Sequence, residues 1–468
     1  MQKSYVVPYS EILLKSFDHR ASGDSKQRSK PFTDDESDDI ESLEKFEPNR
    51  PIKPLADTEP LVFLPYQQEV SAKKEALVEF LKRNRLPGKP EPIVASPLPR
   101  HYRTTTKRRV YFLHGKFRLR FSHRKEAASD TAMLCSALEP KEHDAIYRFL
   151  LEKINSPSFA ISAKHLNYII IRGTYTEFCV IFNVHRLSGP IVRNLKALGE
   201  NLQRLGINIV SALIFFDPTR SDYYLEKSDS GGAWKYKILF GPDTLRLKVS
   251  DQSYQFKPVS FSQINQSILP AFLDTTARLC RPDPAGRLLD LYCGYGLFAI
   301  FIGKHFKETY AVDVDPDSIE CGEKSGTYAM RTEKLAGRMR FRVAPITLAS
   351  LESLLPPEGT MPETILLDPP AGGPAKDVIY YCCSRKPVRV VHLFCDIDRL
   401  PIDIAEWRRG GYWVKSIVPF DMFPGTPSLE VAVLLEPMSP LTKTESNFEG
   451  RHKSKPRANI NNRNQGPG

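Results

Sequence analysis

Two patterns of apolar residues divide the chain. From residue 61 to residue 262, alternating apolar and polar positions predict a strand hairpin around the turn at 114–116. The same pattern predicts further strands at 167–173, 177–184, 209–216 and 235–241. Helical spacing predicts helices over 70–83 and 191–206, and Gly206 is placed to end the second one. We therefore expect 61–262 to form an α+β domain rich in antiparallel strand pairs.

From residue 286 onward, short apolar strands alternate with helical segments. The predicted strands are 287–292, 309–314, 339–343, 364–368 and 388–394, and the predicted helices are 300–306, 317–330 and 347–355. This alternation is typical of an α/β domain with a doubly wound, Rossmann-like parallel sheet, which binds ligands at the carboxyl ends of its strands. The last two runs, 412–420 and 429–437, have a short connection and should pair antiparallel at the sheet edge. We assign 263–437 to this domain.

The two ends of the chain lack such patterns. Residues 1–60 are polar and mixed in charge, and residues 438–468 are basic and rich in Asn and Gly. Segments of this composition cannot bury enough apolar surface to fold alone. We expect a largely disordered extension at one end and a disordered basic tail at the other.

Charge and cysteine usage limit the class of protein. The 468 residues carry a formal net charge of +11, which favours a polyanionic partner, either nucleic acid or a membrane surface. No apolar run approaches the roughly 20 residues that span a bilayer. The eight cysteines include no C-x-x-C pair, so no zinc or iron–sulfur site is expected. We expect a cytoplasmic monomer without a metal centre and without a membrane partner.

A glycine loop marks a nucleotide-type site. Gly294 and Gly296 follow the strand at 287–292 and precede a helix, where glycines permit a tight turn and close approach of a ligand. Asp313 ends the next predicted strand and could accept both hydroxyls of a ribose. The loop fits either a dinucleotide or S-adenosylmethionine, and it does not decide between them.

Three further side chains lie at predicted strand ends. Asp368 ends a strand and is followed by two prolines, which force an extended turn. Cys395 ends the next strand, and Glu430 begins the last one. A carboxylate at the head of a buried strand is costly unless it is paired or used. A cysteine at a strand end is more reachable than one inside the core.

Several short motifs together resemble the RNA uracil-5 methyltransferase family, and in particular its tRNA (uracil-5-)-methyltransferase branch. They are SFSQIN at 260–265, LLDLYCGYG at 288–296, LLDPP at 366–370, HLFC at 392–395 and DMFPGT…E at 421–430, with an upstream SPLPRHYR at 96–103. They occur in the family's order over roughly residues 65–435. The resemblance implies S-adenosylmethionine as cofactor and RNA as partner, with tRNA favoured over rRNA. The cysteines that bind an iron–sulfur cluster in the ribosomal branch have no counterpart.

The resemblance also implies a role for each position. Cys395 corresponds to the nucleophile and Glu430 to the base. The positions that correspond to cofactor or uracil contacts are Gln263, Tyr292, Gly294, Gly296, Asp313 and Asp368. The chain departs from the family pattern at Leu297, Ala371, Asp396, Ile397, Gly425 and Ser428. These departures bear on substrate choice and rate more than on the type of reaction.

The implied chemistry accounts for the residue types. A thiolate that adds to carbon 6 of uracil makes carbon 5 nucleophilic, which is covalent catalysis. A carboxylate then removes the carbon 5 proton. The segment RHYRTTTKRRVYF, which ends near residue 112, is basic with interleaved aromatic residues, and we interpret it as an RNA-facing strand or as an ordinary solvated one. Two alternatives stay open, a non-catalytic RNA-binding protein on the same scaffold and a dinucleotide-dependent oxidoreductase.

Overall fold

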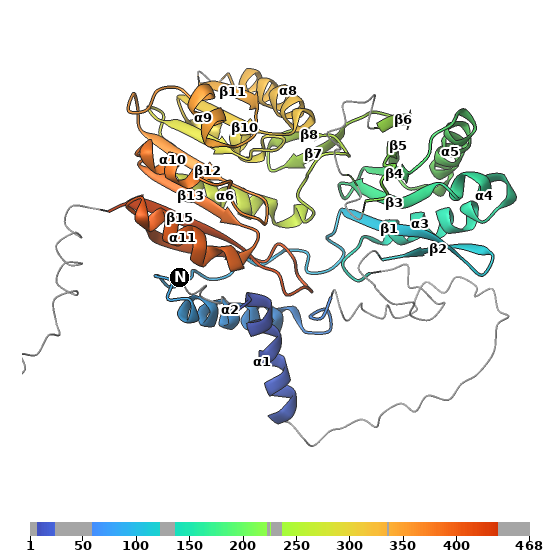
Figure 1. Ribbon diagram of the computed structural model, residues 1–468, viewed down its shortest axis with the longest axis horizontal. Coiled ribbons are helices and arrows are strands. Elements are labelled where there is room, and N and C mark those ends of the chain that lie inside the picture. Colours follow the sequence, from blue (N-terminus) through green and yellow to red (C-terminus); the bar gives the residue numbers. More distant parts are fainter. Residues whose placement is uncertain are drawn as a thin grey trace, which may run out of the picture.

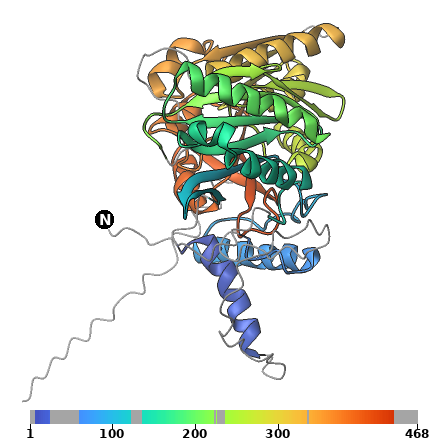
Figure 2. The same ribbon diagram turned by 90° about the vertical axis from the view of Figure 1, so that its right-hand side faces the viewer.

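Two sheets with their helices form the body of the protein (Figure 1). The structure, a computed structural model, describes residues 7–23, 59–121, 136–221, 225, 236–334 and 337–438. The C-terminal and central domains lie side by side, and the N-terminal helices α1 and α2 lie below them in Figures 1 and 2. The tail for which we predict disorder, from residue 439 on, lies outside the described residues, as do residues 24–58.

The C-terminal sheet has seven strands among the described residues, in the order β11-β10-β9-β12-β13-β15-β14. Their bounds are β9 (Arg287–Leu291), β10 (Glu308–Asp313), β11 (Arg338–Val343), β12 (Glu363–Leu367), β13 (Arg389–Phe394), β14 (Tyr412–Phe420) and β15 (Glu430–Pro437). Strands β9 to β13 run parallel, and β15 pairs antiparallel with both β13 and β14. The predicted doubly wound sheet and its antiparallel edge pair are confirmed. The winding reverses between β9 and β12, where such sheets bind ligands.

Helices cover both faces of this sheet. They are α6 (Leu269–Cys280), α7 (Leu297–Phe301), α8 (Pro316–Thr332), α9 (Leu348–Leu354), α10 (Val378–Ser384) and α11 (Leu400–Arg409). Leu288 packs in one apolar core and Leu289 in the other, because successive side chains of a strand point to opposite faces. Strands buried on both faces are continuously apolar, which is why the sequence pattern located them well.

One predicted helix of this domain is displaced. The expected helix over 300–306 is replaced by α7, which ends at Phe301, and by the 3-10 turn η3 (Gly303–His305). A Cβ at Gly303 would lie 2.6 Å from Thr309 Oγ1, and that hydroxyl donates to the Gly303 carbonyl oxygen at 2.9 Å. The close approach of the turn to the next strand therefore ends the helix earlier than its apolar residues suggest.

The central domain has a six-stranded sheet among the described residues, in the order β2-β1-β3-β4-β5-β6. The strands are β1 (Thr105–Leu113), β2 (Lys116–Arg120), β3 (Leu166–Gly173), β4 (Phe178–Val184), β5 (Ile209–Phe216) and β6 (Tyr236–Phe240). The helices α3 (Lys141–Ile154), α4 (Pro157–Ala163) and α5 (Gly189–Leu202) share one apolar core with it. The predicted hairpin β1–β2 is confirmed, but β4 and β5 pair parallel because α5 carries the chain across between them.

A short hairpin that precedes the predicted domain boundary contacts the C-terminal domain. The hairpin of β7 (Leu245–Val249) and β8 (Gln252–Phe256) packs on α8, where Gln255 N donates to Ser325 Oγ at 3.0 Å. The next residue after β8, Lys257, donates to Asp317 Oδ1 at 2.8 Å. Residues 245–257, which we assigned to the domain before residue 263, therefore contact the C-terminal domain.

The N-terminal part of the chain also packs on the C-terminal domain. Helix α2 (Tyr66–Arg83) buries its apolar residues in the core that holds β14 and β15. After it, Val94 N donates to the Pro419 carbonyl oxygen at 2.9 Å, so the chain runs along the outer edge of β14. Within 1–60, where we expected disorder, residues 9–23 form the helix α1, and its Leu13 is buried in the same core. No described helix combines the length and the apolar character that crossing a membrane requires.

Candidate active site

Cys395 is the first residue after β13, at the carboxyl end of the sheet. Its side chain is half-buried, whereas the other cysteines that the structure describes are buried. The Sγ atom lies 3.8 Å from the Pro369 carbonyl oxygen, in the turn that follows β12. The prolines at 369 and 370 keep this turn extended. The nucleophile predicted from the sequence is thus accessible and faces the neighbouring D-P-P turn.

Glu430 lies on the strand beside Cys395. Phe394 pairs with Val431 in the antiparallel register of β13 and β15. Cys395 and Glu430 are therefore neighbours, where β13 ends and β15 begins. The Glu430 side chain is buried, and burial, together with the nearby Asp368 carboxylate, raises its pKa well above the usual value. A carboxylate with a raised pKa is a stronger base when it is deprotonated.

Asp368 completes a group of acidic side chains at this rim. Burial and the charge of Asp313 raise the pKa of Asp368 to about 7. Burial raises the pKa of the Cys395 thiol to about 12, with further contributions from Glu430, Asp368 and Asp396. The structure therefore brings the predicted nucleophile, the predicted base and Asp368 into one electrostatically coupled cluster. The thiol is protonated at neutral pH in this arrangement.

The glycine loop lies at the end of β9, beside the same cluster. Gly294 N donates to Asp313 Oδ2 at 2.8 Å, and Asp315 N donates to Asp313 Oδ1 at 2.8 Å. A Cβ added at Gly294 would meet no described atom within 4 Å, whereas one at Gly296 would lie 2.8 Å from the Phe341 ring. Gly294 thus leaves its backbone open to a ligand, and Gly296 allows close packing under the loop. This arrangement fits a cofactor with a ribose beside Asp313.

The other two predicted cofactor contacts are placed differently. Gln263 is buried, and its segment joins both domains. Thr104 N, just before β1, donates to the Ile264 carbonyl oxygen at 2.9 Å. Asn265 Nδ2 donates to the Met422 carbonyl oxygen at 3.1 Å, which links this segment to the turn before Glu430. Tyr292 instead packs against the core of α10 and α11, and burial raises its pKa to about 12. The role of Tyr292 stays a prediction.

Arg399 is a residue of this site that sequence reasoning missed. It lines a small crevice together with Cys395, Ala371 and Asp403. Its Nη2 donates to Asp403 Oδ1 at 2.7 Å, and its guanidinium lies against Gly373, where a Cβ would be 2.7 Å from Nε. A cation therefore lies beside the D-P-P turn although Ala371 carries none. The i,i+4 spacing of Arg399 and Asp403 was the only sequence signal for it.

A metal site is not formed by the described residues, in which no group of three or more His, Cys, Asp or Glu side chains could hold an ion. What the arrangement offers is a thiol, a buried carboxylic acid on the adjacent strand and a ligand loop with open backbone. Together these groups can add a nucleophile to an electrophilic ring and remove a proton from the same ring.

Comparison with known proteins relates the chain to RNA methyltransferases. Residues 228–334 match the family model described as tRNA (Uracil-5-)-methyltransferase. An uncharacterized RNA methyltransferase of Lactobacillus johnsonii is 24% identical over 386 residues, which cover 80% of this chain and 81% of that protein. Another, from Oceanobacillus iheyensis, is 24% identical over 353 residues, 72% of each chain.

A solved structure has the same fold. It is the tRNA (uracil-54, C5)-methyltransferase of Pyrococcus abyssi in complex with S-adenosyl-L-homocysteine, with a TM-score of 0.59 at 18% sequence identity. The match covers 82% of this chain and 86% of that one. The resemblance to RNA uracil-5 methyltransferases that the motifs indicated is confirmed by these comparisons, and so is the fold class.

Proposed function

We propose that this chain, which resembles RNA uracil-5 methyltransferases in sequence and fold, methylates carbon 5 of a uridine in RNA. The observation that carries the proposal is the placement of Cys395 and Glu430 at one edge of two paired strands, with Asp368 coupled to both. A mechanism that needs a nucleophile on carbon 6 and a base for the carbon 5 proton requires these two groups close together.

Cys395 acts first. Its thiolate adds to carbon 6 of the uracil ring, and the electron pair of the carbon 5–carbon 6 double bond moves into the ring as an enolate. Because its pKa is raised, the thiol carries its proton at neutral pH. It must therefore lose this proton in the complex with RNA before the sulfur adds to carbon 6. The charge of Asp368 is one of the causes of this raised pKa.

Glu430 acts after the new carbon–carbon bond is formed, when carbon 5 carries both its original proton and the methyl group. The Glu430 carboxylate removes the proton, and the electron pair of that C–H bond restores the ring double bond as the Cys395 sulfur leaves carbon 6. The position of Glu430 on the strand beside Cys395 allows both events on one ring.

The cofactor is S-adenosylmethionine, which supplies an electrophilic methyl group when bound. Gly294, Gly296 and Asp313 would hold its nucleoside part, since the backbone of Gly294 is open and Asp313 ends β10 next to it. Asp368 and Gln263 would contact the cofactor or the edge of the uracil ring.

One face of β1 and β2 is suited to bind the RNA. Arg109 pairs with Arg120 and Tyr111 pairs with Arg118, so these side chains share a face of the sheet. The Arg120 guanidinium lies 5.0 Å from the centre of the Tyr111 ring. Cationic and aromatic groups on one face can contact phosphates and stack on bases. We name this set, Arg109, Tyr111, Arg118 and Arg120, the basic face.

We propose tRNA as the substrate, because the matching family model and the Pyrococcus abyssi protein are both tRNA methyltransferases by name. The test is incubation with S-adenosylmethionine labelled in its methyl group and with transcripts of tRNA and of rRNA fragments. Digestion to nucleosides should yield labelled 5-methyluridine from tRNA, and none with the Cys395→Ala variant.

The competing hypothesis is a non-catalytic RNA-binding protein on the same scaffold. The departures at Ala371 and Asp396 and the raised pKa of the Cys395 thiol favour it. It predicts that tRNA binds to the protein while no label enters any RNA. Label in 5-methyluridine excludes it.

A further inference from the structure

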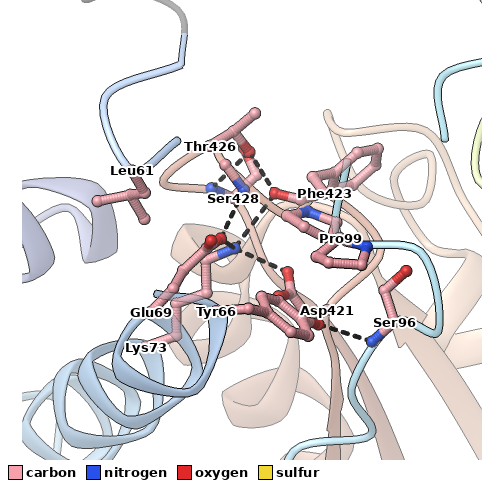
Figure 3. Close-up of polar contacts among 12 residues, drawn as sticks. Leu61, Tyr66, Glu69, Lys73, Ser96, Pro99, Asp421, Phe423, Thr426 and Ser428 are labelled. Atoms are coloured by element: carbon pink, nitrogen blue, oxygen red, sulfur yellow. Dashed lines mark hydrogen bonds and ion pairs between the residues drawn. The ribbon is translucent and has the colours of Figure 1, made fainter. Parts of the chain in front are cut away.

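The turn that leads into Glu430 is held by buried charged side chains of α2 (Figure 3). Lys73 and Glu69 on α2 and Asp421 at the start of the turn have no exposed side-chain surface. Lys73 Nζ lies 2.7 Å from Asp421 Oδ1 and 2.9 Å from Glu69 Oε1. It also donates to the Phe423 carbonyl oxygen at 3.2 Å. The three N–H groups of the ammonium therefore all have acceptors.

Glu69 holds the middle of the same turn. Its Oε1 accepts a hydrogen bond from Gly425 N at 2.5 Å, and its Oε2 accepts from both terminal nitrogens of Arg100 at 3.3 Å. The Tyr102 hydroxyl donates to the Pro424 carbonyl oxygen at 3.0 Å. Two consecutive residues of the turn are thus fixed by side chains from the N-terminal part of the chain.

Gly425 shows how closely the turn is enclosed. Its φ is +82°, and its carbonyl oxygen accepts from Leu61 N at 3.1 Å. A Cβ at this position would lie 2.7 Å from a methyl carbon of Leu138 and 2.8 Å from one of Val62. The turn therefore has no room to shift toward these residues.

A cluster of buried charges is a costly way to stabilise a fold. Replacing such a cluster by apolar residues of similar volume is often neutral or stabilising, so stability alone does not account for Lys73, Glu69 and Asp421. Directed hydrogen bonds do fix one arrangement of the groups they join. Here they fix the turn 421–428, and Leu429, which follows it, packs in the same core as α2. Glu430 comes next.

We infer that Lys73 and Glu69 are positioning residues for Glu430. They contact the turn 421–428, and through it they set where the Glu430 carboxylate lies relative to the uracil ring. The inference rests on the proposed function, and it concerns only the proton-removal step. Cys395 is held by β13 and the D-P-P turn, so its addition to the base does not depend on this cluster.

The addition of Cys395 to carbon 6 and the removal of the carbon 5 proton can be measured separately with RNA that contains 5-fluorouridine. Fluorine on carbon 5 cannot leave as a proton, so the reaction stops after methyl transfer as a covalent Cys395–RNA adduct. Formation of this adduct needs Cys395 but does not need Glu430. Release of 5-methyluridine from ordinary RNA needs both. The variants are Lys73→Met and Glu69→Gln, and the second retains the shape and an acceptor oxygen.

We expect both variants to release methylated ordinary RNA about 10- to 100-fold more slowly, the loss that a misplacement of about 1 Å can cause. The rate of adduct formation with 5-fluorouridine RNA should stay at the wild-type value. With ordinary RNA, a covalent Cys395–RNA species should accumulate in the variants. A merely structural role would change all three quantities together.

The matched control is Lys304→Met, which removes another mostly buried lysine, paired with Glu333 at 2.9 Å. Lys304 lies in η3 beside β10 and β11, at the opposite end of the sheet from β14 and β15, which flank the turn. This control should change neither rate, and thermal unfolding of all three variants shows how much fold stability each has lost. Equal loss of adduct and product, or no loss of product, would overturn the inference. Absence of the adduct in the wild-type protein would instead overturn the proposed function.

Discussion

The Arg172 guanidinium on β3 donates a hydrogen bond of 3.0 Å to the hydroxyl oxygen of Ser262, the residue immediately before Gln263. This bond joins the sheet of the central domain to the segment predicted to contact the cofactor or the uracil. Thr105, at the start of β1, is the register partner of Arg172, so the strand that bears the basic face begins beside this segment. RNA bound along β1, as we propose, would therefore lie next to the segment that holds Gln263.

The basic face should control how RNA binding depends on salt. We expect the double variant Arg118→Ala/Arg120→Ala to weaken tRNA binding. The plot of log affinity against log salt should become flatter by about 0.7–0.9 for each phosphate that the variant no longer neutralises. Filter binding over a salt series measures both quantities. Arg83→Ala, an exposed arginine of α2, is the control and should leave the slope unchanged. An unchanged slope in the double variant would place the RNA elsewhere.

Removal of the base should separate the two halves of the reaction. In Glu430→Gln, we expect release of methylated RNA to fall by about 10²- to 10⁴-fold, the usual contribution of a general base. The covalent adduct with RNA should form and persist, because Gln cannot accept the carbon 5 proton. A denaturing gel with ordinary RNA shows the persistent species. Product release at the wild-type rate would assign the base to another group.

The pH dependence of adduct formation follows from the raised pKa of the Cys395 thiol. Only the thiolate adds to carbon 6, and its fraction grows with pH up to the thiol pKa of about 12. We therefore expect the adduct rate with 5-fluorouridine RNA to increase steadily from about pH 6 to about pH 9, without a plateau. A rate that is level over this range would mean that the thiol is already ionised in the complex.

Asp396→Asn provides an internal check on that prediction. Asp396 is one of the carboxylates that raise the pKa of the Cys395 thiol. Asn can still accept the hydrogen bond that Asp396 accepts from Asp398 N at 3.0 Å. The adduct should therefore form faster at neutral pH, and the whole profile should move to lower pH. A profile that does not move would contradict the charge effect.

Stability should depend strongly on one buried carboxylate at the far end of the sheet. Glu363 pairs with Arg287 at 2.7 Å and with Arg385 at 2.6 Å, and all three side chains are almost fully buried. Glu363→Ala would remove the carboxylate partner of Arg385 and would leave Arg287 with Glu308 at 3.2 Å, so it should lower the free energy of unfolding by about 3–5 kcal/mol. Urea denaturation measures this. Glu79→Ala, from an exposed pair, should change it very little.

The sequence predicted those parts of the fold that repeat a local pattern. The strands β9, β12 and β13 are buried on both faces, so their apolar runs were visible, and Asp368, Cys395 and Glu430 could be placed at strand ends. The pairing of β13 with β15 then brought the last two together. Local pattern also explains why the hairpin β1–β2 was found.

Contacts between distant segments could not be predicted. Lys73 and Asp421 are 348 positions apart, and no local pattern in α2 indicates that its buried face carries charge. The packing of α2 on β14 and β15 and of β7–β8 on α8 depends on tertiary contacts alone. Helix α1 was missed because its few apolar residues find partners only when α2 is in place.

The most direct test of the central claim is to mix the protein with S-adenosylmethionine and 5-fluorouridine tRNA and to run a denaturing gel. We predict a slowly migrating protein–RNA band that disappears in Cys395→Ala and persists in Cys179→Ala, which removes a fully buried cysteine of the central domain. A wild-type protein that binds the tRNA but yields no such band would contradict the assignment of Cys395 as the nucleophile.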